Sequence, residues 1–146
     1  MQQQGSDQAL KLVLIDDHDC AREALVRRLD ADARIAVVGA TPDPSEGRRL
    51  VEELRPDAAL IDARRRDDAG AAAISALASL PDEARPLVVV HTSFFDADDW
   101  RRWREAGAHE WLLKQIDINV LFERLTAAVR EHLSGACCAR QAHAGR

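Results

Sequence analysis

The chain has 146 residues, a formal net charge of −5, and 47% hydrophobic and 31% charged residues. A chain of this length can form one domain around a single hydrophobic core. The negative charge argues against direct binding to nucleic acid, because phosphate contacts need a clustered excess of Lys and Arg.

The sequence contains no evident membrane or targeting signal. No apolar run approaches the roughly 20 residues that cross a bilayer, and residues 1–7 lack a basic stretch followed by an apolar one. We therefore expect a cytoplasmic protein with no membrane partner. Its three cysteines, Cys20, Cys137 and Cys138, have neither a disulfide framework nor a zinc-site spacing, so we expect free thiols.

Short apolar runs alternate five times with helical patterns along the chain. The predicted strands are residues 10–15, 35–39, 58–62, 87–91 and 110–114. The predicted helices are residues 19–32, 41–54, 67–80, 96–106 and 117–133. Asp96 is expected to cap the fourth helix and Gly107 to end it. Residues 1–9 are expected to be frayed and residues 134–146 to form a flexible tail without secondary structure.

The predicted strands are continuous apolar runs rather than alternating ones. This pattern is typical of a parallel sheet that helices cover on both faces. We therefore predict an α/β fold over residues 10–133, with a five-stranded, doubly wound parallel sheet.

Polar residues stand at the carboxyl ends of four of the five predicted strands. The first strand ends at Asp16 and Asp17, the third at Asp62, the fourth at Thr92 and the fifth at Lys114. In open α/β sheets, binding sites lie outside the carboxyl ends of the strands, so we expect these side chains to meet at one edge.

Three carboxylates at one edge repel each other and need a compensating cation. A hard divalent cation such as Mg²⁺ prefers oxygen ligands of this kind. With a lysine and a hydroxyl beside them, the carboxylates match what phosphoryl transfer onto a carboxylate requires. Taken singly, each aspartate could instead be a turn former or a helix cap, Thr92 a loop hydroxyl and Lys114 a solvated side chain.

Several short motifs, in order and spacing, resemble a known family. They are Leu14 to His18, Arg55 to Asp62 followed by Gly70, Val90 to Thr92, Ala106 to Ala108, and Trp111 to Lys114. From about Leu10 to Leu133 the chain resembles the receiver domain of bacterial two-component response regulators. The string from Gly107 to Lys114 is most similar to the subfamily that often carries a helix-turn-helix output domain. The resemblance implies a flavodoxin-like (βα)5 fold.

The resemblance also implies roles for individual residues. Asp62 resembles the phosphoacceptor, which receives phosphoryl from a histidine kinase or a phosphotransfer protein. Asp16 and Asp17 resemble the pair that binds Mg²⁺ together with Asp62, and the backbone carbonyl of Arg64 would be a further ligand.

The expected switch residues lie in or just after the fourth and fifth predicted strands. Thr92 resembles the hydroxyl that turns toward the phosphoryl group, and Lys114 resembles the lysine that contacts a phosphoryl oxygen. Trp111 stands where the family has its switch aromatic, and it is bulkier than the usual Tyr or Phe.

The chain departs from the family pattern after the phosphoacceptor. Arg65 and Arg66 stand where the family commonly has an apolar residue and then proline, and Gln115 replaces a common proline after Lys114. The three arginines of this loop, Arg64, Arg65 and Arg66, could pair with an acidic partner or steer the phosphodonor. The favoured alternative is a solvated loop balanced by the acidic pair at residues 67–68.

Two tryptophans and two histidines near these motifs have simpler explanations. Trp100 and Trp103 lie one helical turn apart and are expected to pack in the core, although a partner surface is the alternative. His18 and His91 are expected to be ordinary residues at strand ends.

These observations support one leading hypothesis and two alternatives. The first is a phosphorylation-switched module that acts through protein contacts, either with a downstream partner or with a second copy of the chain in a homodimer. The second is a degenerate receiver that binds or dimerises independently of phosphate. The third, an aspartyl-phosphate hydrolase or transferase, is disfavoured because the sequence has no inserted cap domain. At most, we expect self-phosphorylation and self-dephosphorylation at Asp62.

Overall fold

The fold is a single sheet of five parallel strands in the order β2-β1-β3-β4-β5. The computed structural model describes residues 8–64, 66 and 68–144, with side chains described as far as His132. The strands are β1 (Leu10–Ile15), β2 (Ile35–Thr41), β3 (Ala58–Asp62), β4 (Leu87–Thr92) and β5 (Glu110–Leu113). This strand order is the flavodoxin-like one, which confirms the predicted fold class.

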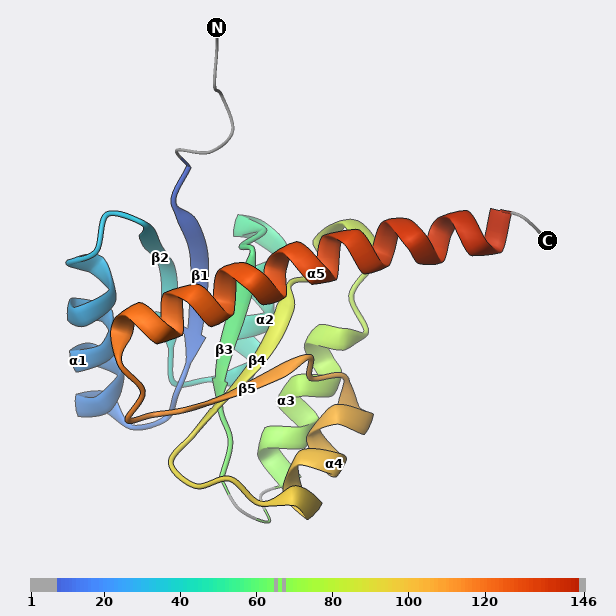
Figure 1. The fold of residues 1–146 in the computed structure, drawn as a ribbon. Helices are drawn as coiled ribbons and strands as arrows, with labels where there is room; N and C mark the ends of the chain where they lie inside the picture. Colours follow the sequence, from blue (N-terminus) through green and yellow to red (C-terminus); the bar gives the residue numbers. More distant parts are fainter. Residues whose placement is uncertain (1–7, 65, 67, 145–146) are drawn as a thin grey trace, which may run out of the picture.

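Helices cover both faces of the sheet (Figure 1). They are α1 (Asp19–Asp30), α2 (Pro44–Leu54), α3 (Asp68–Ala78), α4 (Ala97–Ala106) and α5 (Ile118–Ala144), with a short 3-10 helix, η1 (Asp82–Ala84), before β4. No helix among the described residues is long and apolar enough to cross a membrane.

The two faces of the sheet contribute to two separate halves of the core. Along β1, Leu12 and Leu14 pack in one cluster with residues of α1 and α5, whereas Val13 and Ile15 pack in the other with residues of α2, α3 and α4. Successive side chains of a strand point to opposite faces, so an unbroken apolar run supplies both clusters. Trp103 of α4 is fully buried, which confirms its predicted place in the core.

Capping residues define the ends of α4 as predicted. The Asp96 side chain accepts hydrogen bonds from the backbone N–H groups of Asp98 and Asp99. Gly107 ends the helix with φ of 124°, and a Cβ there would lie 2.4 Å from the Cβ of Ala78. Glycine is therefore required both by the backbone angle and by the close approach of α3.

The C-terminal helix is longer than predicted. Helix α5 ends at Ala144 rather than at Leu133, so the lack of secondary structure expected from residue 134 onward is wrong through Ala144. A single glycine, Gly135, costs a helix only about 1 kcal/mol, and the alanines, arginine and glutamine that follow are good helix formers. The flexibility expected for residues 134–146 stays a prediction, and most of the frayed segment, residues 1–7, lies outside the described residues.

Candidate functional site

The polar residues at the strand ends meet at one edge of the sheet, as the parallel topology requires. Asp62 is the last residue of β3 and is paired with His91 of β4. The backbone N–H of Lys114, just after β5, donates to the carbonyl of Thr92 over 2.8 Å. The loop that follows β1 supplies Asp16 and Asp17.

Lys114 joins two buried carboxylates. Its Nζ lies 2.8 Å from Oδ1 of Asp62 and 3.3 Å from Oδ2 of Asp16. The carboxyl side chains are 7% and 8% exposed, whereas that of Lys114 is 21% exposed. The ammonium group therefore compensates negative charge that has little access to water.

The pKa values of these three groups depart from their usual values for identifiable reasons. Burial raises the pKa of Asp62, and the charges of Asp16 and Asp17 raise it further against the opposing effect of Lys114. Burial alone would also raise the pKa of Asp16, but the backbone N–H of His18 and the Lys114 ammonium lower it below its usual value. Contacts with the two carboxylates outweigh burial and raise the pKa of Lys114, so the lysine stays charged.

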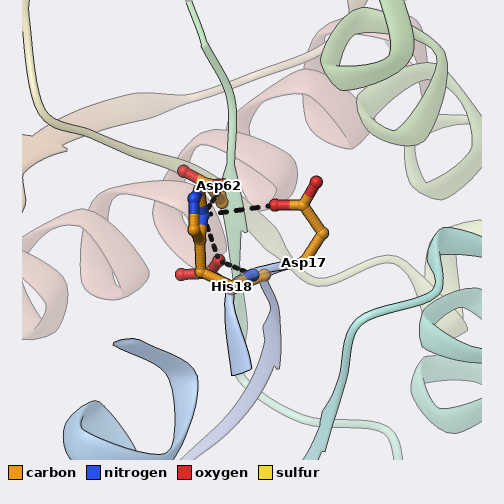
Figure 2. Close-up of side chains that lie close together, drawn as sticks. Asp17, His18 and Asp62 are labelled. Carbon is orange, nitrogen blue, oxygen red and sulfur yellow. Dashed lines mark hydrogen bonds and ion pairs between the residues drawn. The ribbon is translucent and has the colours of Figure 1, made fainter. Parts of the chain in front are cut away.

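Asp17 lies on the more exposed side of the site and has a different cation beside it. The Arg64 guanidinium donates from Nη2 to Oδ1 of Asp17 over 2.7 Å, and its Nε lies 3.9 Å from Oδ2 of Asp62. Nδ1 of His18 lies 3.4 Å from Oδ1 of Asp17 and 4.0 Å from Oδ2 of Asp62. Figure 2 shows the His18 ring turned toward the Asp17 and Asp62 carboxylates.

The donor set at this edge fits a divalent cation. One ligand atom from each of Asp16, Asp17, His18 and Asp62 can be chosen so that all four lie within 4.8 Å of one another. Three of the four are carboxylates, which are the ligands that Mg²⁺ prefers.

Two hollows open beside Asp62. One has a volume of about 160 Å³ and includes Asp17 in its wall, and the other has a volume of about 270 Å³. Asp62 and Arg64 line both hollows. The larger hollow is also lined by His18, Thr92 and Lys114, so a group bound on Asp62 there would meet a hydroxyl and an ammonium.

Thr92 and Trp111, two of the expected switch residues, both have partners in the segment that follows β4. The Thr92 hydroxyl is buried and donates to the carbonyl of Phe94 over 3.2 Å. Trp111 is partly buried and stacks on Phe95, with ring centroids 4.1 Å apart and an interplanar angle of 26°. Both residues therefore contact the segment between β4 and α4.

A family model described as the response regulator receiver domain matches residues 12–126 of the chain. The chain belongs to the response regulator receiver family. It is thus a receiver domain of two-component signalling, as its motifs suggested.

Two transcriptional regulators with similar sequences agree with this assignment. The transcriptional regulatory protein LiaR of Bacillus subtilis (strain 168) is 32% identical over 142 residues, which cover 93% of this chain and 66% of that protein. The DNA-binding transcriptional activator DevR/DosR of Mycobacterium tuberculosis is 33% identical over 107 residues, which cover 73% of this chain and 48% of that protein. The chain spans between about half and two thirds of the length of these relatives.

Solved structures support the same fold. The signal receiver domain of the response regulator NarL from Mycobacterium tuberculosis is similar with a TM-score of 0.65 and 27% sequence identity, covering 88% of this chain and 97% of that chain. The relatives and this structure also confirm the likeness to the subfamily that often carries a helix-turn-helix output domain.

Sequence reasoning missed two side chains of this receiver domain. His18 was expected to be an ordinary strand-end residue, yet its ring contacts the acidic cluster. Arg64 was assigned a role only through its backbone carbonyl, and the charge of its loop was expected to be balanced by residues 67–68. In the structure, the Arg64 guanidinium pairs with Asp17. The available signal was proximity, because His18 adjoins Asp17 and Arg64 lies two residues after Asp62. Arg65 and Asp67 lie outside the described residues.

Proposed function

We propose that this receiver domain accepts a phosphoryl group on Asp62 from a sensor histidine kinase or a phosphotransfer protein, in a reaction that depends on Mg²⁺. The observation that supports this best is the position of Asp62. Its buried carboxylate lies 2.8 Å from the Lys114 ammonium and clusters with Asp16 and Asp17, in the wall of a hollow that Thr92 also lines. A nucleophilic carboxylate that contacts an ammonium group and belongs to a cation-binding cluster suits phosphoryl transfer.

In this proposal, Asp16, Asp17 and Asp62 hold the magnesium ion, and the backbone carbonyl of Arg64 is a further ligand. The bound ion supplies positive charge that neutralises the phosphoryl oxygens. A bond forms between phosphorus and an Asp62 carboxylate oxygen as the bond from phosphorus to the donor imidazole nitrogen breaks, and the imidazole takes up a proton.

The remaining residues of the site then respond to the phosphoryl group. Lys114 exchanges its contact with the Asp62 carboxylate for one with a phosphoryl oxygen. The Thr92 hydroxyl leaves the carbonyl of Phe94, which it contacts at 3.2 Å, and donates to the same group. Because Phe95 stacks on Trp111 in the adjoining segment, this movement changes the surface that β5 and α4 offer to a downstream protein or to a second copy of the chain.

The test is phosphorylation with acetyl phosphate and Mg²⁺, followed by intact mass. The wild type should gain one phosphoryl group and the Asp62→Asn variant none. Asp57→Asn is the matched control, because Asp57 precedes the same strand and its carboxylate accepts from the backbone N–H of Lys11 at the opposite edge of the sheet. Modification that persists in Asp62→Asn would eliminate the assignment.

A second candidate is a receiver whose binding does not depend on phosphate. One observation favours it: Lys114 and Arg64 already compensate the carboxylates of the site in the structure. If this candidate is right, wild type and Asp62→Asn should bind the downstream protein with equal affinity, with or without acetyl phosphate.

A further inference from the structure

The Arg64 side chain reaches into the acidic pocket. Besides its 2.7 Å hydrogen bond to Asp17, its Nη2 lies 3.1 Å from Nδ1 of His18. Its Nε lies 3.9 Å from a carboxylate oxygen of Asp62. The guanidinium thus contacts three of the four residues whose ligand atoms cluster closely enough to hold a metal ion.

The backbone holds Arg64 in reach of this pocket. Asp62 ends β3, and the next residue, Ala63, is 1% exposed and packed in the core. The side chain of Arg64 therefore starts from a fixed point beside the carboxylates. A tethered cation has a high effective concentration at a site that it can reach.

The same loop is held at its other end by α4. Arg66 has a left-handed backbone with φ of 57°, and its N–H donates to Oδ1 of Asp99 over 3.1 Å. Asp99 is buried on α4. The loop after β3 thus has one anchor in the acidic pocket and another on α4, the helix that follows the segment after β4.

We propose that the Arg64 guanidinium competes with the divalent cation for the acidic pocket, so that metal binding displaces the guanidinium from Asp17. The inference rests on the proposed function, since it assumes that the acidic pocket binds a divalent cation. A guanidinium and a metal ion compete for the same Asp17 oxygens, and their positive charges repel each other when both lie beside one carboxylate.

The expected size of the effect follows from the exposure of the pair. Arg64 and Asp17 are about half exposed, and an exposed pair of this kind changes an equilibrium by no more than about fivefold. Removing a positive charge beside a divalent ion adds a further small factor in a site screened by water. We expect Arg64→Ala to bind Mg²⁺ about threefold to tenfold more tightly than the wild type.

The experiment is a calorimetric titration of four proteins with Mg²⁺. They are the wild type, Arg64→Ala, Arg64→Lys and Arg48→Ala. Arg48 is the matched control, because it is a half-exposed arginine on α2 paired with Glu52 at 3.4 Å, and its loss changes the net charge equally. Arg64→Ala should gain affinity, Arg64→Lys should stay closer to the wild type, and Arg48→Ala should match the wild type.

A second measurement follows the displacement itself. The Arg64 Nε–H signal in a ¹⁵N NMR spectrum, assigned by its loss in Arg64→Lys, should shift during the Mg²⁺ titration with the same midpoint as the heat. Equal or weaker Mg²⁺ binding by Arg64→Ala, or an Arg64 signal that does not move, overturns the inference while metal binding stands. If neither the wild type nor Arg64→Ala binds Mg²⁺, the proposed function fails as well.

Discussion

Replacing Lys114 by methionine tests the electrostatic balance of the site. The substitution keeps an unbranched side chain, one atom shorter, but leaves two carboxylates, 7% and 8% exposed, without the ammonium that lies 2.8 and 3.3 Å away. Breaking a fully buried ion pair in this way costs about 3–5 kcal/mol. Since Lys114 is 21% exposed, we expect the free energy of unfolding to fall by about 2–3 kcal/mol.

Urea denaturation in the absence of divalent cations measures this loss. If the cost comes from the uncompensated carboxylates, it should be smaller in an Asp62→Asn background, with a coupling free energy of about 1–2 kcal/mol between the two substitutions. Adding Mg²⁺ at ten times its Kd should restore about 1.4 kcal/mol. An equal cost of Lys114→Met in both backgrounds would refute the reasoning, because the lysine would then act through packing alone.

Three further predictions concern residues outside the cation-binding cluster. Burial lowers the pKa of His91 to about 4, so the folded state holds it neutral. Its contribution to stability is complete above the unfolded pKa of about 6.5 and is lost as the pH falls toward 4, by up to about 3 kcal/mol; His91→Leu should flatten that part of the pH profile measured by urea denaturation. Asp99→Ala removes the buried acceptor that holds the loop after β3 and should cost about 1–3 kcal/mol, whereas the exposed Asp98 should tolerate the same change within about 0.5 kcal/mol. Gly107→Ala places a Cβ 2.4 Å from that of Ala78 at a positive φ and should lower the thermal midpoint by the equivalent of about 1–3 kcal/mol; an unchanged midpoint would contradict that account.

The order of the elements could be read from the sequence because it depends on local patterns. Continuous apolar runs predict strands that are buried on both faces, and all five lie where they were expected, within two residues at each end. The parallel arrangement then places the ends of β1, β3 and β5 at one edge. The contacts of Lys114 with Asp16 and Asp62 follow from that topology, and so these three residues could be grouped before the structure was known.

Tertiary structure alone decided which long side chains enter the acidic cluster. The directions of Arg64 and His18 depend on the loops after β3 and β1, which have no periodicity from which a side-chain direction could be inferred. In the loop after β3, Arg66 has a left-handed backbone, and its N–H donates a hydrogen bond to Asp99, which lies 33 positions further along the chain. The sequence by itself determined the order of strands and helices and the carboxylates at the strand ends, because apolar runs and the residues that end them are local patterns. The position of the Arg64 guanidinium beside Asp17 depends on the path of the loop after β3, which is held by contacts with residues distant in the chain.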